Sequence, residues 1–175
     1  MTGAGTIWTI GHSTRTADEF LRLLEAHGIE QIADVRAVPK SARHPQFNGV
    51  ALDAFLASNH RVYRHFPALG GLRKPRRDSI NTAWRHPSFR GYADHMQTPE
   101  FQAGVAALLE FAERPTAVMC AEAVWWQCHR RLLSDALVAR NVTVRHILGP
   151  GEAKLHELNE FARVTDGSVS YPGLL

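Results

Sequence analysis

The densest cluster of reactive side chains lies in residues 118–131, V-M-C-A-E-A-V-W-W-Q-C-H-R-R. This segment holds both cysteines of the chain, one glutamate, one histidine, two arginines and two adjacent tryptophans. Three kinds of site are compatible with this composition: a metal site, a cysteine nucleophile beside an anion-binding turn, or a structural junction between a strand and a helix. The spacing of the residues bears on each alternative.

A metal site would use Cys120, Cys128 and His129, which are zinc-binding side chains, with Glu122 or His12 as further ligands. The order C-A-E is similar to zinc deaminases, in which a glutamate transfers protons. The P-C-x-x-C motif of those enzymes is absent, and only one further cysteine follows. Adjacent residues on a helix point about 100° apart, so Cys128 and His129 cannot easily bind one ion. We predict no cofactor and retain a zinc or iron enzyme that uses these cysteines and His129 as an alternative.

An anion site would use the start of the helix that the apolar spacing predicts over 128–140. The first turn of a helix offers free backbone N–H groups and the positive end of the helix dipole. Arg130 could add a guanidinium, which binds phosphate through two hydrogen bonds. The structural alternative is that Arg130 pairs with Glu122 or Asp34 and braces the turn.

The position of Cys120, at a strand end facing a helix, is similar to that of the reactive cysteine in rhodaneses and cysteine phosphatases. Nearby arginines and the helix dipole would stabilise its thiolate. The C-x5-R spacing of those sites is absent. We therefore expect Cys120 to be buried and unreactive. Cys128 is expected to be structural, or a thiol close enough to Cys120 to sense oxidants.

Proton transfer is assigned to His12 and Glu122, with Asp34 as a third catalytic candidate. Free histidine has a pKa near neutrality, which suits general acid–base catalysis. Alternatively, His12 caps the following helix or holds the Asp34 carboxylate. The tryptophans at 125 and 126 could pack in the core, form a lid or stack on a base. The candidate anion-binding and substrate-binding residues are Ser13, Arg36, Arg43, Tyr92, Trp126, His129 and Arg130.

Periodicity and punctuation predict the elements that position these side chains. A capping box from Thr16 to Glu19 begins a helix, and Pro99 suits the first position of another. The predicted strands are 6–10, 32–38, 62–66, 116–120 and 142–148, and the predicted helices are 16–28, 50–57, 98–114, 128–140 and 154–163. This alternation predicts an α/β fold, a Rossmann-like three-layer arrangement in which helices flank a mostly parallel sheet.

The stretch 67–97 is predicted to be a long loop, which suggests function because compact domains rarely contain one. Lys and Arg are frequent in 61–90, where Asp78 is the one acidic residue. Cations interleaved with aromatic rings suit a nucleotide or a single-stranded nucleic acid, although a solvated loop has similar composition. The cations are Arg61, Arg64, Arg73, Lys74, Arg76, Arg77, Arg85 and Arg90, and the rings are Tyr63, Phe66, Trp84, Phe89 and Tyr92.

The length of 175 residues and the hydrophobic content of 45% predict one domain over 1–175, with a C-terminal tail at 164–175. Two cysteines do not form a disulfide framework of the small secreted type. The N-terminus does not read as a signal peptide, and no apolar run is long enough to span a membrane. We therefore expect a cytoplasmic protein whose partner is an anionic small molecule or nucleic acid; the sequence does not define its oligomeric state.

Ligands of parallel sheets bind at the carboxyl ends of the strands, where the strand order reverses. If the strand at 116–120 lies beside the strand at 6–10, one set of side chains converges there: His12, Asp34, Arg36, Cys120 and Glu122.

Several short motifs together resemble the DUF488 family of uncharacterised bacterial and archaeal proteins. They are T-I-G-H-S at 9–13, D-V-R at 34–36, P-Q-F-N at 45–48, L-G-G at 69–71, C-A-E at 120–122, C-H-R at 128–130 and V-R-H-I at 144–147. The order and spacing are similar over nearly the whole chain, and the W-W-Q before C-H-R is similar to one branch of the family. The resemblance implies a fold and a motif pattern and does not imply a reaction.

The sequence therefore favours an enzyme, a hydrolase or transferase, that acts on a phosphate-bearing substrate such as a nucleotide or nucleic acid. His12 and Glu122 would transfer protons, and Arg36, Arg43 and Arg130 would bind the anion. The alternative of another class is a non-catalytic module that binds nucleic acid or a protein partner through residues 61–90.

Overall fold

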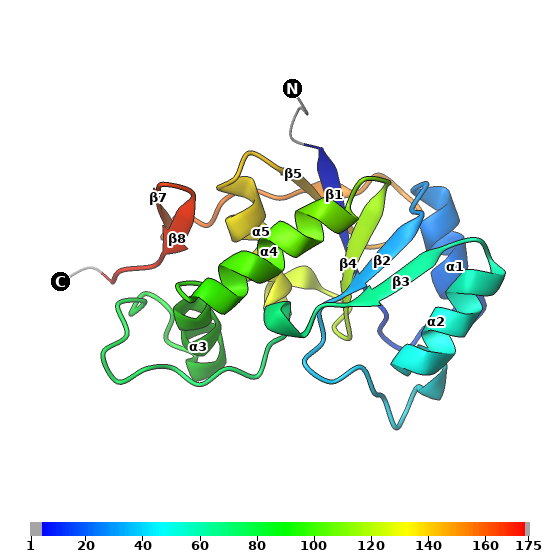
Figure 1. The fold of residues 1–175 in the computed structure, drawn as a ribbon, viewed down its shortest axis with the longest axis horizontal. Helices are drawn as coiled ribbons and strands as arrows, with labels where there is room; N and C mark the ends of the chain where they lie inside the picture. Colours follow the sequence, from blue (N-terminus) through cyan, green and yellow to red (C-terminus); the bar gives the residue numbers. More distant parts are fainter. Residues whose placement is uncertain (1–4, 174–175) are drawn as a thin grey trace.

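The computed structural model describes residues 5–173 and contains a central six-stranded sheet (Figure 1). The strand order is β3-β2-β4-β1-β5-β6. Five strands are parallel, and β6 runs antiparallel at the edge. The strands are β1 (Thr6–Gly11), β2 (Gln31–Asp34), β3 (Val62–His65), β4 (Thr116–Cys120), β5 (Thr143–Ile147) and β6 (Lys154–Leu155). The predicted fold class is confirmed.

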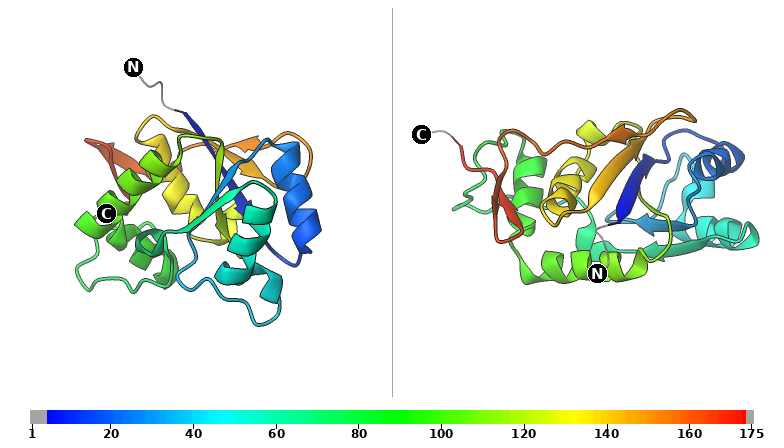
Figure 2. Two further views of the ribbon diagram at one scale, coloured as in Figure 1. Left: turned by 45° about the vertical axis from the view of Figure 1, so that its right-hand side comes forward. Right: turned by 90° about the horizontal axis from the view of Figure 1, so that it is seen from above.

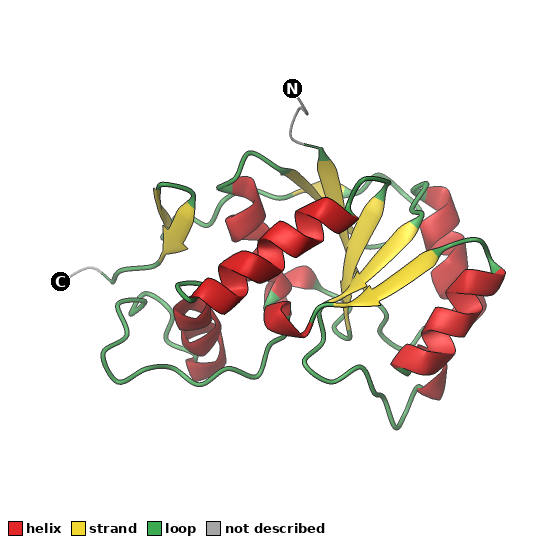
Figure 3. Ribbon diagram, viewed as in Figure 1, coloured by secondary structure: helices red, strands yellow, loops and turns green. Residues whose placement is uncertain are grey.

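Helices cover both faces of the sheet, which gives three layers (Figures 2 and 3). Two apolar clusters form, one on each side of the sheet, because the strands are buried on both faces. Phe20 and Leu52 lie in the first cluster, and Phe101 and Leu132 lie in the second. The helices of the first face are α1 (Ala17–Ala26) and α2 (Gly49–Ser58), and those of the second are α3 (Pro87–His95), α4 (Pro99–Phe111) and α5 (Arg130–Val138).

The predicted helix starts agree with the structure because local capping determines them. The hydroxyl of Thr16 accepts a hydrogen bond from the Glu19 N–H, and the Glu19 carboxylate accepts one from the Thr16 N–H, each at 3.1 Å. This reciprocal capping box begins α1. Thr98 caps α4, and Pro99 occupies its first turn.

The predicted loop at 67–97 is wrong over residues 87–95, where α3 forms. Pro87 lies in the first turn of α3, and the His86 ring accepts a hydrogen bond from the Ser88 N–H. Gly91 lets the helix approach the preceding segment, because a Cβ there would lie 2.1 Å from the carbonyl oxygen of Arg73. Proline and glycine, which suggested a loop, here begin a helix and allow it to pack.

The predicted helix at 154–163 is also wrong, since this region extends the sheet and then continues into a hairpin. β6 pairs with β5, and the two strands of the hairpin, β7 (Arg163–Thr165) and β8 (Ser168–Ser170), pair with each other. Asp166 and Gly167 both have positive φ, at 50° and 77°, as a tight hairpin turn requires. These strands occupy the start of the tail predicted at 164–175; residues 174 and 175 lie outside the described residues.

Strand β2 ends at Asp34, earlier than the predicted Val38. The Asp34 carboxylate accepts a hydrogen bond from the backbone N–H of Arg36 at 3.1 Å, which turns the chain out of the sheet. Within residues 5–173, no helix has both the length and the apolar character needed to cross a membrane.

Candidate active site

The carboxyl ends of β1 and β4 lie side by side, with Gly11 opposite Cys120. The pairing continues past the strands, because the N–H of His12 donates to the Cys120 carbonyl and that of Ser13 donates to the Ala121 carbonyl, each at 2.9 Å. Gly11 is needed here, since a Cβ at this position would lie 1.6 Å from the carbonyl oxygen of Glu122. The strand adjacency on which the predicted convergence depends is therefore present.

Two cysteine sulfurs meet at this edge of the sheet. Cys120 Sγ lies 3.0 Å from Cys128 Sγ, and both side chains are buried free thiols. Cys128 Sγ also accepts hydrogen bonds from Arg130, from the backbone N–H at 3.3 Å and from Nε at 3.2 Å. Cys128 lies just before α5, so the anion site expected at this helix start is occupied by a sulfur of the protein itself.

The Arg130 side chain is fully buried, with 0% of its surface exposed. Its terminal nitrogens donate to the Glu122 backbone carbonyl at 2.6 Å and to Thr9 Oγ1 at 3.3 Å. Among residues 5–173, no carboxylate forms a salt bridge with Arg130. A buried cation requires a counter-charge, and Cys128 is the partner that can supply one as a thiolate. The structural alternative, in which Arg130 pairs with the carboxylate of Glu122 or Asp34, is therefore not formed.

Of these two thiols, one ionises much more readily than the other. Burial alone would raise the pKa of Cys128, but the hydrogen bond from Cys120 and the charge and hydrogen bonds of Arg130 outweigh burial and lower this pKa from 9.0 to about 6. Burial and the neighbouring Cys128 raise the pKa of Cys120 well above its usual range. The negative charge therefore resides on Cys128, and Cys120 remains a protonated donor to it.

A buried chain of hydrogen bonds extends from Arg130 into the fold behind the site. Thr9 Oγ1 accepts from Arg130, so its own proton is donated to His146 Nδ1 at 2.6 Å. His146 Nε2 then donates to His156 Nδ1, and His156 Nε2 donates to the Asp135 carboxylate, each at 2.8 Å. The assignment follows from Arg130, which can only donate.

The middle of this chain and its Asp135 end are both held in place. Trp125 stacks on His146 with ring centroids 4.2 Å apart, and the Tyr171 hydroxyl donates to Asp135 at 2.7 Å. Burial and His156 lower the pKa of His146 to about 2, so its ring is neutral in the folded protein. The sequence reasoning missed these residues as a group. The only signals were the V-R-H-I motif and the histidine in the predicted helix at 154–163.

Asp34 and Arg36 form a buried ion pair, and Arg36 borders the pocket that both cysteines line. Arg36 Nε and Nη2 donate to the carboxylate of Asp34 at 2.9 and 2.7 Å, and the Tyr63 hydroxyl donates to the same carboxylate at 2.5 Å. Arg36 Nη2 also donates to the Phe47 carbonyl at 2.7 Å. Both members of the ion pair are engaged by the protein, so the geometry favours a bracing role for Asp34 and Arg36.

His12 lies between this ion pair and the cleft. Its Nδ1 donates to the Ser13 carbonyl at 2.9 Å, which leaves Nε2 to accept from Arg36 at 3.4 Å. The ring stacks on Phe47 with centroids 4.4 Å apart. Burial is the main cause that lowers the pKa of His12, and the charge of Arg36 adds to it, so the ring is neutral near pH 7. His12 thus contacts the arginine and not the Asp34 carboxylate.

Three adjoining pockets form a cleft over these strand ends. A pocket of about 310 Å³ is bordered by both cysteines, Lys40 and Glu122. A second, of about 720 Å³, is bordered by His12, Ser13, Arg43, Glu122 and Trp126, and a third, of about 530 Å³, by Glu122, Trp126, Tyr92 and Cys128. Glu122 borders all three pockets and is the one carboxylate to do so within the described part of the chain.

The other predicted site residues have mixed surroundings. Arg43 is exposed at the cleft and Trp126 is 43% exposed, so both are open to a ligand. The Tyr92 ring is buried and its hydroxyl donates to the Leu69 carbonyl. His129 Nε2 donates a hydrogen bond to the Val35 carbonyl at 2.8 Å.

The metal ligands considered from the sequence do not converge. Cys128 Sγ faces Cys120 and Arg130, whereas the ring of His129 faces Val35. In the part of the chain that the structure describes, no cluster of three or more His, Cys, Asp or Glu side chains has an arrangement that could hold a metal ion.

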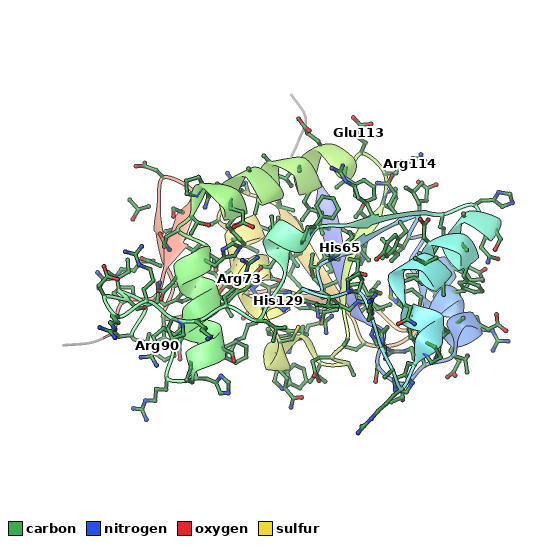
Figure 4. All side chains as sticks on the ribbon, turned by 60° about the horizontal axis from the view of Figure 1, so that its bottom comes forward. His65, Arg73, Arg90, Glu113, Arg114 and His129 are labelled. Atoms are coloured by element: carbon green, nitrogen blue, oxygen red, sulfur yellow. The ribbon has the colours of Figure 1, made fainter. Side chains whose placement is uncertain are left out.

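The basic segment 61–90 is less open than its composition suggests. Arg73 donates to the carbonyls of Pro67 and Gly70, and Figure 4 shows Arg73 on the side of α3 toward His129 and Arg90 on the other side of that helix. Arg76 pairs with Asp78 at 3.0 Å. Of the aromatic rings in and beside this segment, Phe66 and Tyr92 are buried, and Tyr63, Trp84 and Phe89 pack against the apolar clusters. The rings expected to stack on bases contribute instead to the core.

Comparisons with known proteins place the chain by its family. A search of curated proteins finds no match, and a search of solved structures finds none. The family described as "Domain of unknown function DUF488" matches residues 16–137, a span that includes α1, the Asp34–Arg36 pair, both cysteines and Arg130. The chain therefore belongs to the DUF488 family.

Proposed function

We propose that this protein is an enzyme that acts on a phosphate-bearing substrate, a nucleotide or nucleic acid, with the Cys128 thiolate as its nucleophile. One observation supports the proposal most strongly: Cys128, paired with the buried Arg130, forms part of the floor of a cleft at the carboxyl ends of parallel strands. Active sites of parallel sheets lie at this edge.

The side chains around the cleft suit an anionic ligand. Lys40 and Arg43 are exposed at its border, and Glu122 is the one acidic residue there in the described chain. Hydrogen bonds between a cation and a phosphate are worth about 1.5–3 kcal/mol each. Arg36 and Arg130 would act through the protein, one by holding the loop after β2 and the other by holding the thiolate.

In the proposed reaction, Cys128 Sγ bonds to the phosphorus and the bond from phosphorus to the leaving oxygen breaks. Glu122 borders every part of the cleft and is proposed to donate the proton that the leaving oxygen needs. A water or an acceptor alcohol then gives its proton to the Glu122 carboxylate and displaces the thiolate from the phosphorus, so the overall reaction is hydrolysis or transfer. His12, which is neutral and contacts Arg36, is a second candidate for proton transfer.

The test compares binding and turnover in matched variants. Calorimetric titration with a panel of nucleoside mono-, di- and triphosphates and short oligonucleotides should identify a ligand of the wild-type protein. Replacing Lys40 and Arg43 by Met should weaken its binding by about tenfold or more, equivalent to about 1.4 kcal/mol. The control replaces Lys74 and Arg77, exposed cations of the basic segment that do not border the cleft, and should leave binding unchanged.

The opposite pattern would support the alternative function. Loss of binding in the Lys74 and Arg77 variant alone would favour a nucleic-acid-binding module that uses residues 61–90. For catalysis, Cys128→Ser should abolish turnover of the ligand and retain its binding. Turnover at the wild-type rate in Cys128→Ser would refute the role of the thiolate.

A further inference from the structure

We propose that Cys120 and Cys128 form a redox-active pair in which Cys128 attacks a low-molecular-weight disulfide and Cys120 resolves the product into an intramolecular disulfide. This activity requires the two sulfurs and the pocket above them, and it goes beyond the phosphate chemistry proposed above. The two activities share Cys128 and have different substrates.

The positions of the two sulfurs fit the two roles. Both cysteines border the pocket of about 310 Å³, and Cys128 also borders the neighbouring pocket of about 530 Å³. Cys128 is 8% exposed and Cys120 is 3% exposed, so an incoming disulfide reaches Cys128 first. The sulfurs are 3.0 Å apart, and a disulfide bond of about 2.05 Å requires an approach of only about 1 Å.

The chain around the pair can supply this approach. Cys120 is fixed at the end of β4, where its neighbours pair with β1. Cys128 ends the segment 121–128 between β4 and α5, which contains exposed residues and one short 3-10 helix, Trp125–Gln127. A shift of about 1 Å in such a connecting segment leaves the sheet and α5 intact.

Arg130 distinguishes the two cysteines chemically. The attacking species in disulfide exchange is a thiolate, and Arg130 donates two hydrogen bonds to Cys128 Sγ. In the described chain, Cys120 Sγ donates to the Glu122 carbonyl at 3.8 Å and shares a hydrogen bond with Cys128 Sγ, and neither partner is a cationic donor. Cys128 is therefore the attacking residue, and Cys120 is the resolving residue.

The reaction balances without any further oxidant. The Cys128 thiolate bonds to one sulfur of the disulfide R–S–S–R, whose S–S bond breaks and releases RS⁻. The Cys120 sulfur then bonds to Cys128 Sγ, the bond between Cys128 and the bound RS group breaks, and the proton of Cys120 leaves with that group as RSH. The dithiol is oxidised by two electrons and the small disulfide is reduced to RS⁻ and RSH.

The burial of Arg130 makes the disulfide easy to reduce. Oxidation removes the thiolate, so the buried guanidinium loses its counter-charge. A charge pair that exists only in the reduced state favours reduction of the disulfide. An ordinary monothiol should therefore reduce the disulfide back to the dithiol, and a strong dithiol reductant should not be required.

The experiment follows the sulfur chemistry by mass spectrometry with oxidised glutathione as the probe. Reduced wild-type protein should lose the mass of two hydrogens, and peptide mapping should join Cys120 to Cys128. In the Cys120→Ser variant, the reaction should stop at a glutathione adduct on Cys128. Cys128→Ser should react at Cys120 at least about tenfold more slowly than wild type reacts, because Cys120 lacks a stabilised thiolate. Reduced glutathione should restore the wild-type dithiol.

Several results would overturn the proposal. These are a stable glutathione adduct in the wild-type protein without ring closure, equal reactivity of Cys120 in Cys128→Ser, and a disulfide that resists reduced glutathione. Cys120→Ala provides a second resolving-residue variant, and circular dichroism verifies that each variant is folded. The assay contains no phosphate substrate, so its failure would leave the proposed phosphate chemistry intact, and the failure of nucleotide turnover would leave the redox pair intact.

Discussion

Replacing Arg130 by methionine tests whether a buried arginine holds Cys128 as a thiolate. The substitution removes the charge of the side chain and its Nε hydrogen bond to Cys128 Sγ, and it keeps a side chain of comparable length. Without this charge, only the hydrogen bonds from Cys120 and from the backbone N–H of residue 130 still oppose the effect of burial, so the pKa of Cys128 should rise from about 6 toward its ordinary value of 9.0. For a complete rise, the Cys128 thiol is about 90% ionised at pH 7 in the wild-type protein and about 1% ionised in the variant.

The alkylation rate at a single pH is a poor measure of this difference. A thiolate whose pKa is about three units higher is about 16- to 30-fold more nucleophilic, because nucleophilicity rises with basicity. At pH 7 the two effects nearly cancel, and the variant should react only about three- to sixfold more slowly than wild type. Above about pH 8 the variant should react faster, so the two rate profiles should cross.

The assay is the rate of iodoacetamide alkylation from pH 4 to 10, measured in a Cys120→Ser background so that a single thiol reacts. The parent profile should have a lower midpoint than the Arg130→Met profile, by up to about three pH units. Arg131→Met is the matched control, since Arg131 is on the same helix but lies over Trp84. Arg130→Lys keeps a charge and should give an intermediate midpoint. Coincident midpoints in folded Arg130→Met and parent proteins would refute the reasoning.

Three further outcomes follow from the surroundings of the pair. Gly11→Ala should displace the Glu122 carbonyl that accepts a hydrogen bond from Arg130, so urea unfolding should show a less stable protein. An unchanged stability would contradict the close approach of residue 11 to this carbonyl. Asp34→Asn should cost about 3–5 kcal/mol in the same assay because it leaves a buried arginine uncompensated, whereas Tyr63→Phe removes one hydrogen bond and should cost about 1 kcal/mol. The pKa of His146 is lower in the folded state, at about 2, than in the unfolded chain, so His146 stabilises the folded protein above about pH 6.5 and this stabilisation is lost as the pH falls. The free energy of unfolding should therefore drop from pH 7 to pH 4.5 by about 2–3 kcal/mol less in His146→Gln than in the wild-type protein.

The elements predicted from local signals agree with the structure. The strand at 116–120 is an apolar run between Pro115 and a polar turn, and its predicted bounds are those of β4. The reciprocal bonds of Thr16 and Glu19 depend only on neighbouring residues, so sequence reasoning could identify them. The convergence of His12 and Cys120 was predictable because the ends of adjacent parallel strands meet at one edge.

The errors arise where distant contacts override local preference. The helix expected at 154–163 is replaced because β6 completes the edge of the sheet and His156 binds Asp135, more than twenty positions earlier in the chain. The loop expected at 67–97 contains α3 because its buried residues pack on a face that only the folded chain provides. Periodicity within one segment does not contain this information.

The partner of Arg130 illustrates the same limit within the site. Its sequence neighbours include a glutamate, which made a carboxylate brace reasonable. In the structure, Glu122 contributes its backbone carbonyl, and the side chain stays exposed at the cleft. The turn at 121–128 brings Cys128 back to Cys120, so the charge partner is a sulfur. Only the path of this turn distinguishes the two arrangements.

The most direct test of the thiolate is carbon-13 NMR of protein labelled at the cysteine Cβ, which gives one signal from each of the two cysteines. Each signal shifts when its own sulfur ionises, so a pH titration reports which thiol loses its proton and at which pH. We predict that the Cys128 signal titrates with a midpoint near 6 and that the Cys120 signal stays that of a thiol above pH 9. Two signals that both titrate above about pH 8.5, as unperturbed thiols do, would contradict the central claim.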